Sequence, residues 1–453
     1  MKAFPSRRTI TVARSILSSL LLIVFVISLP NAFGQLVQTP TTEEQRRRAQ
    51  VNEEERQRLV QEPKVDLRSE DQFDIVDTHG LPPETPCFAI QHITLATSPH
   101  LSDSNKQQGA SALQMDPFFF AQQYLNRYSN QCVGQEGLNI IIKRLTSLIL
   151  QKGYSTTRVG LPEQELASGH LTITLVPGII HEIRFADPLL DGTWRNAFPI
   201  DTGKLLNLRD LEQGLEQMKR VPYQDVDMQI VPADKVGESN VILSVQRHDA
   251  VKLSASLDNG GAKGTGQYQG GVNLSVDNLF GISDMFNIGV NSDANREGNQ
   301  RGTAGQNLYY AVPFGFWYYS LSASNSDYHQ EIAGTGQHIV SSGKSKNLDI
   351  KTSYLFQRDQ YQKNSLNVNF GKQWAHAFID NTEIDVQKRD VTYVEFGWTH
   401  KHYFDQNQLD LTIAQRCGTS WFGGQSDAPD RTSDYLLQKA LTTITWHLTI
   451  NPK

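Results

Sequence analysis

The chain reads Val251-Lys-Leu-Ser-Ala-Ser-Leu257, so that apolar and polar side chains alternate residue by residue. Successive side chains of a strand point to opposite faces, so Val251 and Leu253 would line one face and Lys252 the other. The same alternation returns in about ten short runs between Val251 and Ile450. A transmembrane β-barrel has this pattern, because its strands meet lipid on one face and water on the other. A soluble β-sandwich has it too, so the alternation alone leaves both folds open.

Residues 1–34 have the features of a secretory signal peptide. A basic start precedes an apolar run from Ile16 to Leu29, and Ala32-Phe-Gly34 resembles a cleavage site. Pro30 ends the apolar run short of a full helical span, which favours cleavage near Gln35 over a retained anchor. No other apolar run approaches a helical span, and strands cross a membrane only as a closed barrel. These features favour an antiparallel β-barrel in an outer membrane.

The composition agrees with a barrel that has a wet lumen. Hydrophobic residues make up 38% of the chain and the mean hydropathy is -0.42, whereas helical membrane proteins are far more apolar. The net charge of -6 and the pI of about 6.1 give no reason to expect nucleic-acid binding. The chain has no Gly-x-Ser-x-Gly, His-Glu-x-x-His or phosphate-loop motif, so the sequence predicts neither an enzyme nor a cofactor.

The three cysteines favour an oxidising compartment. Cys87 and Cys132 bracket one candidate module, and we predict a disulfide between them. Cys417 is then left as a lone thiol near the end of a predicted strand. His400 and His402 lie two residues apart without a further clustered ligand, so a pore or loop position is favoured over a metal site.

Residues 35–62 contain a predicted charged helix. Its core, from Glu43 to Leu59, is rich in helix formers, with Glu and Arg three or four residues apart and almost no apolar face. Such a segment can be a solvated spacer, can be disordered, or can sit inside a water-filled barrel. Pro63 ends the helix, and the proline-containing residues 63–86 are predicted to form an extended linker.

Two small α+β modules are predicted next, at residues 87–178 and 179–248. In the first, a strand from Phe88 to Leu95 and a strand from Leu171 to Val176 flank a helix that ends before Gly153. The apolar stripe of that helix comprises Leu138, Ile142, Leu145 and Ile149.

The second module has the same order of elements. A helix begins at Asn207, which can cap it, and Asp210 lies near its positive end. The buried stripe of this helix is predicted to comprise Leu208, Leu211, Leu215 and Met218. The strands are predicted at Ile180 to Phe185, Val226 to Ile230 and Val241 to Val245.

Several stretches, taken in their order and spacing, resemble one family. They are Gly153-Tyr-Ser-Thr-Thr-Arg158, Leu161-Pro-Glu-Gln164, Gly169-His-Leu171, Asn207-Leu-Arg-Asp-Leu-Glu-Gln-Gly-Leu-Glu-Gln217, Leu257-Asp-Asn-Gly260 and Gly264-Thr-Gly266. The chain resembles the two-partner secretion transporters of Gram-negative outer membranes, also called haemolysin activation or secretion proteins, and the resemblance spans most of the mature chain.

This resemblance implies a role for each segment. The two modules would be polypeptide-transport-associated (POTRA) domains in the periplasm, and residues 35–62 would be a plug helix that occupies the pore at rest. Residues 249–453 would be the transmembrane β-barrel, surrounded by outer-membrane lipid. The implied partner is an unfolded secreted polypeptide, such as an adhesin, haemolysin or toxin.

An α+β module can bind an extended peptide as an added strand, so we expect the secreted partner to dock on the modules before it enters the barrel. The plain structural alternative makes Asn207 and Asp210 helix caps, and makes Arg209 and Glu212 a solvated face. The candidate contact residues lie on the helix of the second module and are Asn207, Arg209, Asp210, Glu212, Gln213 and Gln217.

A second candidate group belongs to the first barrel hairpin, where glycines permit positive φ angles and close backbone approach. These residues are Asp258, Gly260, Gly264 and Gly266.

The barrel region is shorter than the resemblance implies. It holds about ten strands, lacks the family's Val-Arg-Gly-aromatic loop motif, and stops at Asn451-Pro-Lys453. Since an outer-membrane barrel needs closure, we expect a truncated chain or a degenerate gene, with a smaller closed barrel or pairing with a second copy as alternatives. A transporter remains the expected function, and a non-functional truncated transporter is one alternative to it. The nearest other function is an assembly factor for outer-membrane proteins, which usually carries more modules. A small-solute porin would not need the modules.

Overall fold

A computed structural model describes Val65 and residues 80–295, 300–333, 338–404, 407–425 and 439–447. These residues all belong to one compact unit, residues 47–453. The predicted signal peptide and the charged helix of residues 35–62 lie outside the described residues. Most of the predicted linker and Asn451-Pro-Lys453 also lie outside them.

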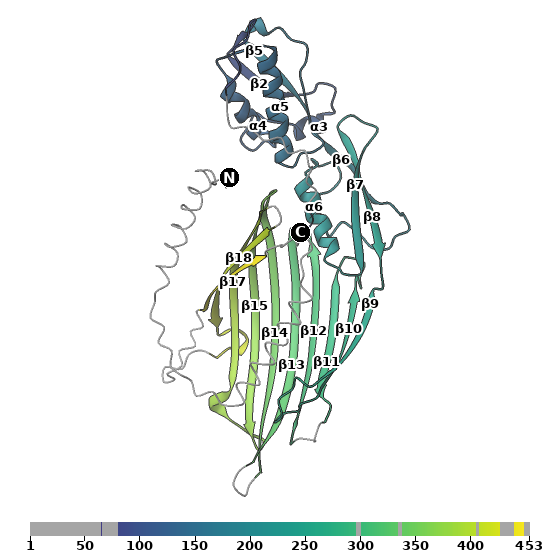
Figure 1. Ribbon diagram of the computed structural model, residues 1–453, viewed down its shortest axis with the longest axis vertical. Coiled ribbons are helices and arrows are strands. Elements are labelled where there is room, and N and C mark those ends of the chain that lie inside the picture. Colours follow the sequence, from purple (N-terminus) through teal and green to yellow (C-terminus); the bar gives the residue numbers. More distant parts are fainter. Residues whose placement is uncertain are drawn as a thin grey trace, which may run out of the picture. The chain divides into compact units, whose positions relative to one another are not determined.

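The first module places three helices beside two small sheets (Figure 1). Strand β2 runs parallel to β5, and β4 pairs with the other side of β5. The separate pair β1 and β3 is antiparallel. The elements are β1 (Phe88–Ile90), β2 (His92–Thr97), α3 (Asp103–Gln108), α4 (Phe119–Leu125), η1 (Asn126–Tyr128), β3 (Gln131–Val133), α5 (Gln135–Gln151), β4 (Arg158–Gly160), η2 (Leu166–Ser168) and β5 (His170–Val176).

The single strand predicted from Phe88 to Leu95 is wrong, because the chain changes partner at Gln91. The main-chain N–H groups of Gln91 and His92 both donate to the carbonyl oxygen of Gly169. Residues before this point pair with β3 and residues after it pair with β5. The alternation of apolar and polar residues does not reveal such a change of partner strand, because the chain is extended both before and after Gln91.

Helix α5 packs its apolar face on the main sheet of the first module. Leu145 and Ile149 are buried against Leu171 and Ile173 of β5. The helix ends before Gly153, whose φ of 95° suits the left-handed position that follows a helix. The predicted helix and its terminal glycine are confirmed.

The first turn of α5 is capped by a residue from the linker side. Gly134 at the N-cap has no side chain, and the carboxylate of Glu84 accepts hydrogen bonds from the N–H groups of Gly134, Glu136 and Gly137 at 2.8–2.9 Å. These donors, that of Gly137 foremost, hold the pKa of Glu84 below its usual range. Glu84 thereby satisfies N–H groups that a helix start leaves without partners.

The second module repeats this architecture with one helix and three strands. The parallel pair β6 and β8 and the antiparallel pair β7 and β8 give the sheet order β6-β8-β7. The Asn207 side chain accepts a hydrogen bond from the N–H of Arg209 at 2.9 Å, so it caps the helix. The elements are β6 (Ile179–Phe185), α6 (Leu208–Lys219), β7 (Gln224–Pro232) and β8 (Glu238–Arg247).

Part of the core of the second module comes from the loop between β6 and α6. Leu211, Leu215 and Met218 of α6 are buried as predicted, whereas Leu208 is half-buried. The loop adds buried residues that periodicity does not mark, since the loop belongs to no helix or strand. They are Trp194, Ala197, Phe198 and Leu206.

Gly214 allows α6 to lie directly on Phe198. A Cβ added at Gly214 would lie 2.3 Å from ring atoms of Phe198, which is buried in the core. Alanine favours a helix over glycine by about 1 kcal/mol, but overpacking a core costs about 1–3 kcal/mol. We therefore expect Gly214→Ala to weaken the hydrogen-exchange protection of α6. The double variant Gly214→Ala/Phe198→Leu should recover part of this protection, and a Gly214→Ala variant as protected as the native chain would contradict the packing argument.

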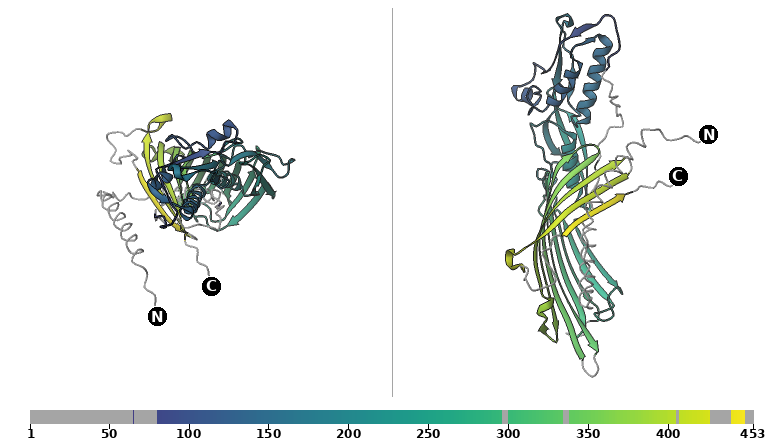
Figure 2. Two further views of the ribbon diagram at one scale, coloured as in Figure 1. Left: turned by 90° about the horizontal axis from the view of Figure 1, so that it is seen from above. Right: turned by 90° about the vertical axis from the view of Figure 1, so that its left-hand side faces the viewer.

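The remaining strands form one antiparallel sheet that curves on itself (Figure 2). Consecutive strands are neighbours from β9 to β19, and the short β16 pairs with β15 alone. Among the described residues β9 and β19 are the two edge strands. The strands are β9 (Val251–Asp258), β10 (Gln269–Asp277), β11 (Met285–Asp293), β12 (Gly302–Phe314), β13 (Trp317–Ala333), β14 (His338–Arg358), β15 (Gln362–Ile379), β16 (Thr382–Glu383), β17 (Arg389–Phe404), β18 (Asn407–Thr419) and β19 (Lys439–His447).

The register of the sheet separates an apolar face from a polar face, as the alternation predicted. Two short 3-10 helices interrupt the strand order: η3 (Asp385–Gln387) follows β16, and η4 (Trp421–Gly423) follows β18. One row across neighbouring strands is apolar and comprises Leu253, Leu274, Ile288, Leu308 and Ala323. The adjacent row is polar or small and comprises Ser254, Asn273, Gly289, Asn307 and Ser324.

Within the described ranges, no helix has both the length and the apolar character needed to cross a membrane.

Candidate functional site

We call the long antiparallel sheet from β9 to β19 the barrel sheet, or the barrel for short. Two glutamines of α6 bind main-chain carbonyl groups of the turn between its strands β12 and β13. Gln217 Nε2 donates to the carbonyl oxygens of Gly315 and Trp317 at 2.9 and 3.3 Å. Gln213 Nε2 donates to the same Gly315 oxygen at 3.4 Å. Gly315 has a φ of 59°, which favours glycine, in the turn that presents its oxygen. One face of α6 is therefore attached to the barrel at this turn (Figure 1).

The same face of α6 carries acidic residues that bind basic residues of β14 and β15. Arg358 lies at the end of β14 and donates to Glu216 at 2.6 Å, to Glu212 at 3.2 Å and to Gln213 at 3.1 Å. Lys363 of β15 donates to both carboxylate oxygens of Glu216 at 2.6 Å. We call Glu212, Glu216, Arg358 and Lys363 the junction cluster.

The junction cluster excludes water almost completely. The side chains of Arg358, Glu212 and Glu216 are 4%, 2% and 6% exposed. Buried charges are tolerated when they are paired and hydrogen-bonded. Besides Arg358, Glu212 has a second cationic partner in Arg209, whose Nη1 lies 2.6 Å from Glu212 Oε1. Burial alone would raise the pKa of Glu216, but the positive charges of Lys363 and Arg358 outweigh it and hold that pKa below its usual range.

Asp210 lies on the same helix, two residues before Glu212 of the junction cluster. Burial raises the pKa of Asp210 to about 6, although the positive charge of Arg358 opposes this shift.

The main chain of Val65 also lies in the junction cluster. Its N–H donates to Glu216 Oε1 at 3.1 Å, and its carbonyl oxygen accepts from Arg358 Nη2 at 3.3 Å. The Val65 side chain packs against the core of the second module. A linker residue far away in the sequence therefore contacts both α6 and β14.

The second module contacts the barrel at an apolar patch as well. Val221 and Tyr223, which follow α6, are buried with Met285 of β11 and Tyr309 and Ala311 of β12. The hydroxyl of Tyr223 accepts a hydrogen bond at 2.9 Å from the side chain of a residue in the β10–β11 turn. The junction thus combines an apolar contact with buried ion pairs.

The structure corrects the alternative role considered for two residues of α6. Arg209 and Glu212 do not form a solvated face, because they are 9% and 2% exposed. Arg209 is paired with Glu212, and Glu212 binds Arg358 of β14. Amphipathic periodicity assigns polar residues to solvent, and it does not reveal that a second domain covers them. Asn207 acts as a cap, while Gln213 and Gln217 bind the barrel. In the sequence, only the many Glu and Gln residues of this helix indicate that these positions could be functional. The sequence does not indicate which barrel residues they bind.

The first barrel hairpin connects β9 to β10 and contains the second group of candidate residues. The Asp258 carboxylate accepts a hydrogen bond from the N–H of Gly260 at 2.8 Å. Gly266 has a φ of 122°, and a Cβ there would lie 2.4 Å from Asp293. A Cβ at Gly264 would lie 2.7 Å from Gln330 Nε2, so this glycine permits a close approach to β13.

The cysteines and histidines singled out in the sequence lie at separate places. Cys87 and Cys132 are joined in a disulfide, and Cys417 is a free thiol on β18. His400 and His402 lie on β17, and His400 Nδ1 is 2.9 Å from an amide oxygen of β15. In the part of the chain that the structure describes, no three or more His, Cys, Asp or Glu residues are grouped so that they could hold a metal ion.

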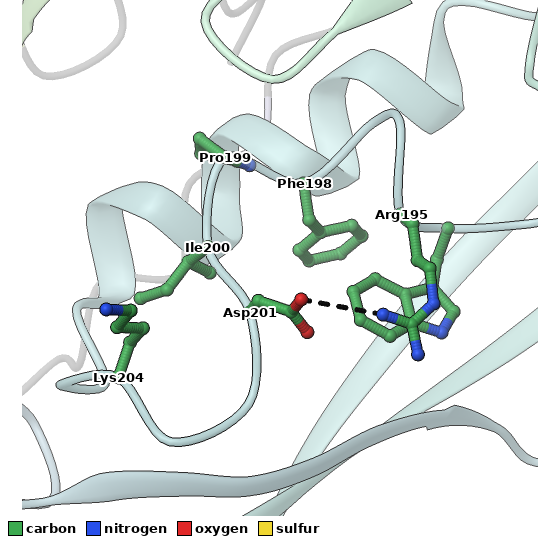
Figure 3. Close-up of a pocket in the computed structure, with 7 residues that line it drawn as sticks. Arg195, Phe198, Pro199, Ile200, Asp201 and Lys204 are labelled. Atoms are coloured by element: carbon green, nitrogen blue, oxygen red, sulfur yellow. Dashed lines mark hydrogen bonds and ion pairs between the residues drawn. The ribbon is translucent and has the colours of Figure 1, made fainter.

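A surface pocket lies in the loop of the second module (Figure 3). Phe198 forms its floor, and an ion pair of 3.5 Å joins Arg195 to Asp201 across its mouth. Both of these charged side chains are more than half exposed, so the pocket lacks the buried polar groups that orient a small-molecule ligand.

Three family models match the chain. Residues 88–178 match the POTRA domain, ShlB-type, and residues 179–232 match the POTRA domain. Residues 237–453 match the haemolysin secretion/activation protein ShlB/FhaC/HecB.

Curated relatives are similar over most of the chain. The chain is 40% identical over 412 residues to the outer membrane transporter CdiB-2 of Burkholderia pseudomallei (strain 1026b), covering 88% of this chain and 70% of that protein. It is 27% identical to the hemolysin transporter protein ShlB of Serratia marcescens, covering 66% of this chain and 53% of that protein. The chain thus spans about half the length of the second relative.

Two solved structures share the fold. CdiB from Escherichia coli matches with a TM-score of 0.72 and 25% identity, covering 91% of this chain and 73% of that chain. CdiB from Acinetobacter baumannii matches with a TM-score of 0.69 and 22% identity, covering 85% of this chain and 72% of that chain. The predicted fold class, POTRA modules followed by an antiparallel barrel sheet, is confirmed.

Proposed function

Because the chain belongs to the haemolysin secretion/activation protein family of outer-membrane transporters, we propose that it exports a secreted partner polypeptide through its barrel. Its POTRA modules face the periplasm and its barrel sheet lies in the outer membrane. The names of the relatives describe transporters, which disfavours the alternative of an assembly factor for outer-membrane proteins. The observation that carries this proposal is the attachment of the second POTRA module to the barrel through the junction cluster.

The two faces of the barrel sheet suit a conduit in lipid. Leu253, Val290 and Phe396 are largely exposed on the apolar face, which fits contact with outer-membrane lipid. The polar face carries many asparagine, serine and glycine residues, together with charged residues of both signs such as Lys351, Glu395 and Arg416. Asparagine and serine offer neutral hydrogen-bonding groups to a passing main chain.

An extended partner polypeptide needs an accessible strand edge, and the first POTRA module covers one of its edges. The Gln122 side chain accepts from the N–H of Leu95 at 2.7 Å and donates to the carbonyl oxygen of Ile93 at 2.8 Å. Ser111 donates to the carbonyl oxygen of Leu95 at 2.8 Å. These side chains occupy the places that a further strand beside β2 would take.

The other side of this sheet is covered in the same way beyond the short strand β4. The Gln164 side chain accepts from the N–H of Thr172 at 2.7 Å and donates to its carbonyl oxygen at 2.8 Å. One glutamine amide thus satisfies both main-chain groups of a residue on β5, and the uncovered part of this edge is limited to three residues of β4.

Strand β7 of the second POTRA module offers a longer edge. It has nine residues and pairs with β8 alone among the described strands. The bond from the N–H of Ala233 to Glu238 continues the ladder, so odd-numbered residues of β7 bond to β8 and even-numbered ones point outward. Pro232, which has no N–H to donate, occupies one of these outward positions. We assign partner docking to this edge.

The docking role of β7 is testable with one proline. Met228 is an even-numbered residue, so Met228→Pro removes an outward N–H and leaves the bonds to β8 in place. We expect about tenfold weaker binding of an unfolded secreted partner polypeptide, since each main-chain bond contributes about 1 kcal/mol and proline also distorts the edge. Pull-down of that polypeptide by the full-length transporter in detergent measures this.

Met228→Ala is the matched control, because it shortens the same side chain and keeps the N–H. It should bind the polypeptide within about twofold of the native chain, a difference well below 1 kcal/mol. Equal binding by the proline variant would exclude β7 as the docking edge. Docking through the α6 residues Asn207, Arg209, Asp210, Glu212, Gln213 and Gln217 would then be the remaining proposal, and it requires the junction to open first, since several of them are buried.

A further inference from the structure

Four large apolar side chains are exposed where the second POTRA module meets the barrel. Leu189, in the loop between β6 and α6, is 88% exposed, and Phe280, in the turn between β10 and β11, is 67% exposed. Phe314 at the end of β12 and Trp317 at the start of β13 are exposed as well. A group of exposed apolar side chains marks a surface that another apolar phase or molecule covers. We call these four residues the rim patch.

Three residues of the rim patch continue the apolar face of the barrel sheet. Phe314 and Trp317 are paired across β12 and β13, and they alternate in phase with Leu308 of the apolar row. Tyr310 has the same phase, and the ring of Phe280 packs edge-on against the Tyr310 ring with their centroids 6.2 Å apart. The turn residue Phe280 therefore extends the face that fits contact with lipid.

The loop between β6 and α6 is bound to the same end of the barrel (Figure 1). The N–H of Thr193 donates to the carbonyl oxygen of Gly281 at 2.8 Å. A Cβ at Gly192 would lie only 2.8 Å from that oxygen, so the two main chains are in direct contact. Asn196 Nδ2 donates to the carbonyl oxygen of Pro313 at 3.1 Å. The loop thus contacts the β10–β11 turn and the end of β12.

These contacts fix the position of Leu189. The Asp187 carboxylate accepts a hydrogen bond from the N–H of Leu189 at 2.9 Å, which holds the turn that presents this side chain. Leu189 precedes Gly192 by three residues, so their Cα atoms are at most about 11 Å apart. Gly192 touches Gly281, which directly follows Phe280. Leu189 is therefore held close to the apolar end of the barrel sheet.

A cationic side chain accompanies the rim patch. Arg195 directly precedes Asn196, its side chain is more than half exposed, and its guanidinium lies 4.9 Å from the centroid of the Trp194 ring (Figure 3). An arginine at a membrane interface can lay its stem on apolar surface while its guanidinium binds lipid phosphate groups. Exposed apolar side chains, an adjoining lipid-facing sheet and a nearby cation together fit a phospholipid surface.

We propose that the rim patch inserts into the periplasmic leaflet of the outer membrane, so that the loop between β6 and α6 anchors the second POTRA module to phospholipid. This inference rests on the placement of the barrel in the outer membrane. The module is then held by two different contacts. The junction cluster binds it to the strand ends, and Leu189 binds it to the leaflet.

The test measures the surroundings of Leu189 with a spin label. Leu189→Cys, in a Cys417→Ser background, is labelled in the full-length protein and placed in vesicles of phosphatidylethanolamine and phosphatidylglycerol. Oxygen concentrates in lipid and a nickel chelate stays in water, so the ratio of the two collision rates reports insertion. We expect this ratio at Leu189 to approach that of a label at Phe396→Cys on the apolar face of β17, and to fall when Phe280→Ser is added.

Val236→Cys is the matched control. Val236 is apolar and 75% exposed, and it lies in the turn between β7 and β8, at the end of β8 that is opposite to β9. Its label should collide mainly with the nickel chelate, with a ratio severalfold below that of Leu189.

Three results would contradict the proposal. A label in water at Leu189 and in lipid at Phe396 would overturn the rim patch alone and would leave the transporter function standing. Labels in lipid at both Leu189 and Val236 would also overturn it, because the whole module would then lie on the membrane. A label in water at Phe396 would remove the membrane placement of the barrel, and with it both the rim patch and the proposed function.

Discussion

Replacing Arg358 with methionine should destabilise the contact between α6 and the barrel by about 3–5 kcal/mol, the usual cost of removing one partner of a buried ion pair. Glu212 would keep Arg209 and Glu216 would keep Lys363, but each would lose its bonds to Arg358. Methionine fills much of the arginine volume, so the loss is mainly one of charge. Hydrogen exchange of the amides of α6 should accelerate roughly a hundredfold or more, because about 1.4 kcal/mol corresponds to a factor of ten.

A compensating variant separates buried charge from packing. Arg358→Met combined with Glu212→Gln and Glu216→Gln removes the unpaired carboxylates, so part of the lost protection should return. Lys351→Met is the control, because it removes a positive charge from the same strand, β14, but outside the junction cluster. We expect it to leave the hydrogen exchange of α6 largely unchanged. Unchanged exchange in Arg358→Met would show that the ion pairs do not hold α6 to the barrel.

Loss of the disulfide should destabilise the first POTRA module by up to about 4 kcal/mol, the chain-entropy value for a loop of this length. Cys87 and Cys132 are 45 residues apart and tie the start of β1 to β3. The double variant Cys87→Ser/Cys132→Ser avoids leaving a reactive thiol. We expect its first module to be cleaved by protease at a lower urea concentration than that of the native chain.

The third cysteine provides the matched control for this experiment. Cys417 is a free, half-buried thiol on β18 of the barrel, so Cys417→Ser should leave the urea concentration for cleavage of the first module unchanged. A reducing agent applied to the native chain should reproduce the effect of the double variant. Equal protease resistance of the native chain and the double variant would mean that the bond adds no stability to this module.

Local sequence patterns were enough to predict most helices and strands and which side chains of each element share a face. Alternation in Val251 to Leu257 places Leu253 and Lys252 on opposite faces whatever strand lies beside them, because a strand has a two-residue period. The cap at Asn207 and the glycine after α5 follow from the needs of helix ends. These features depend on neighbours in the sequence, so the sequence is sufficient for them.

The site depends instead on contacts between distant residues. Arg358 is 142 residues from Glu216 and 293 residues from Val65, and no periodicity links these positions. A polar residue on a helix looks the same in sequence whether solvent or another domain covers it, which is why the solvated reading of Arg209 and Glu212 fails. Alternation and capping report local geometry, whereas the burial and pairing of charge arise only when the second POTRA module and the strand ends of the barrel meet.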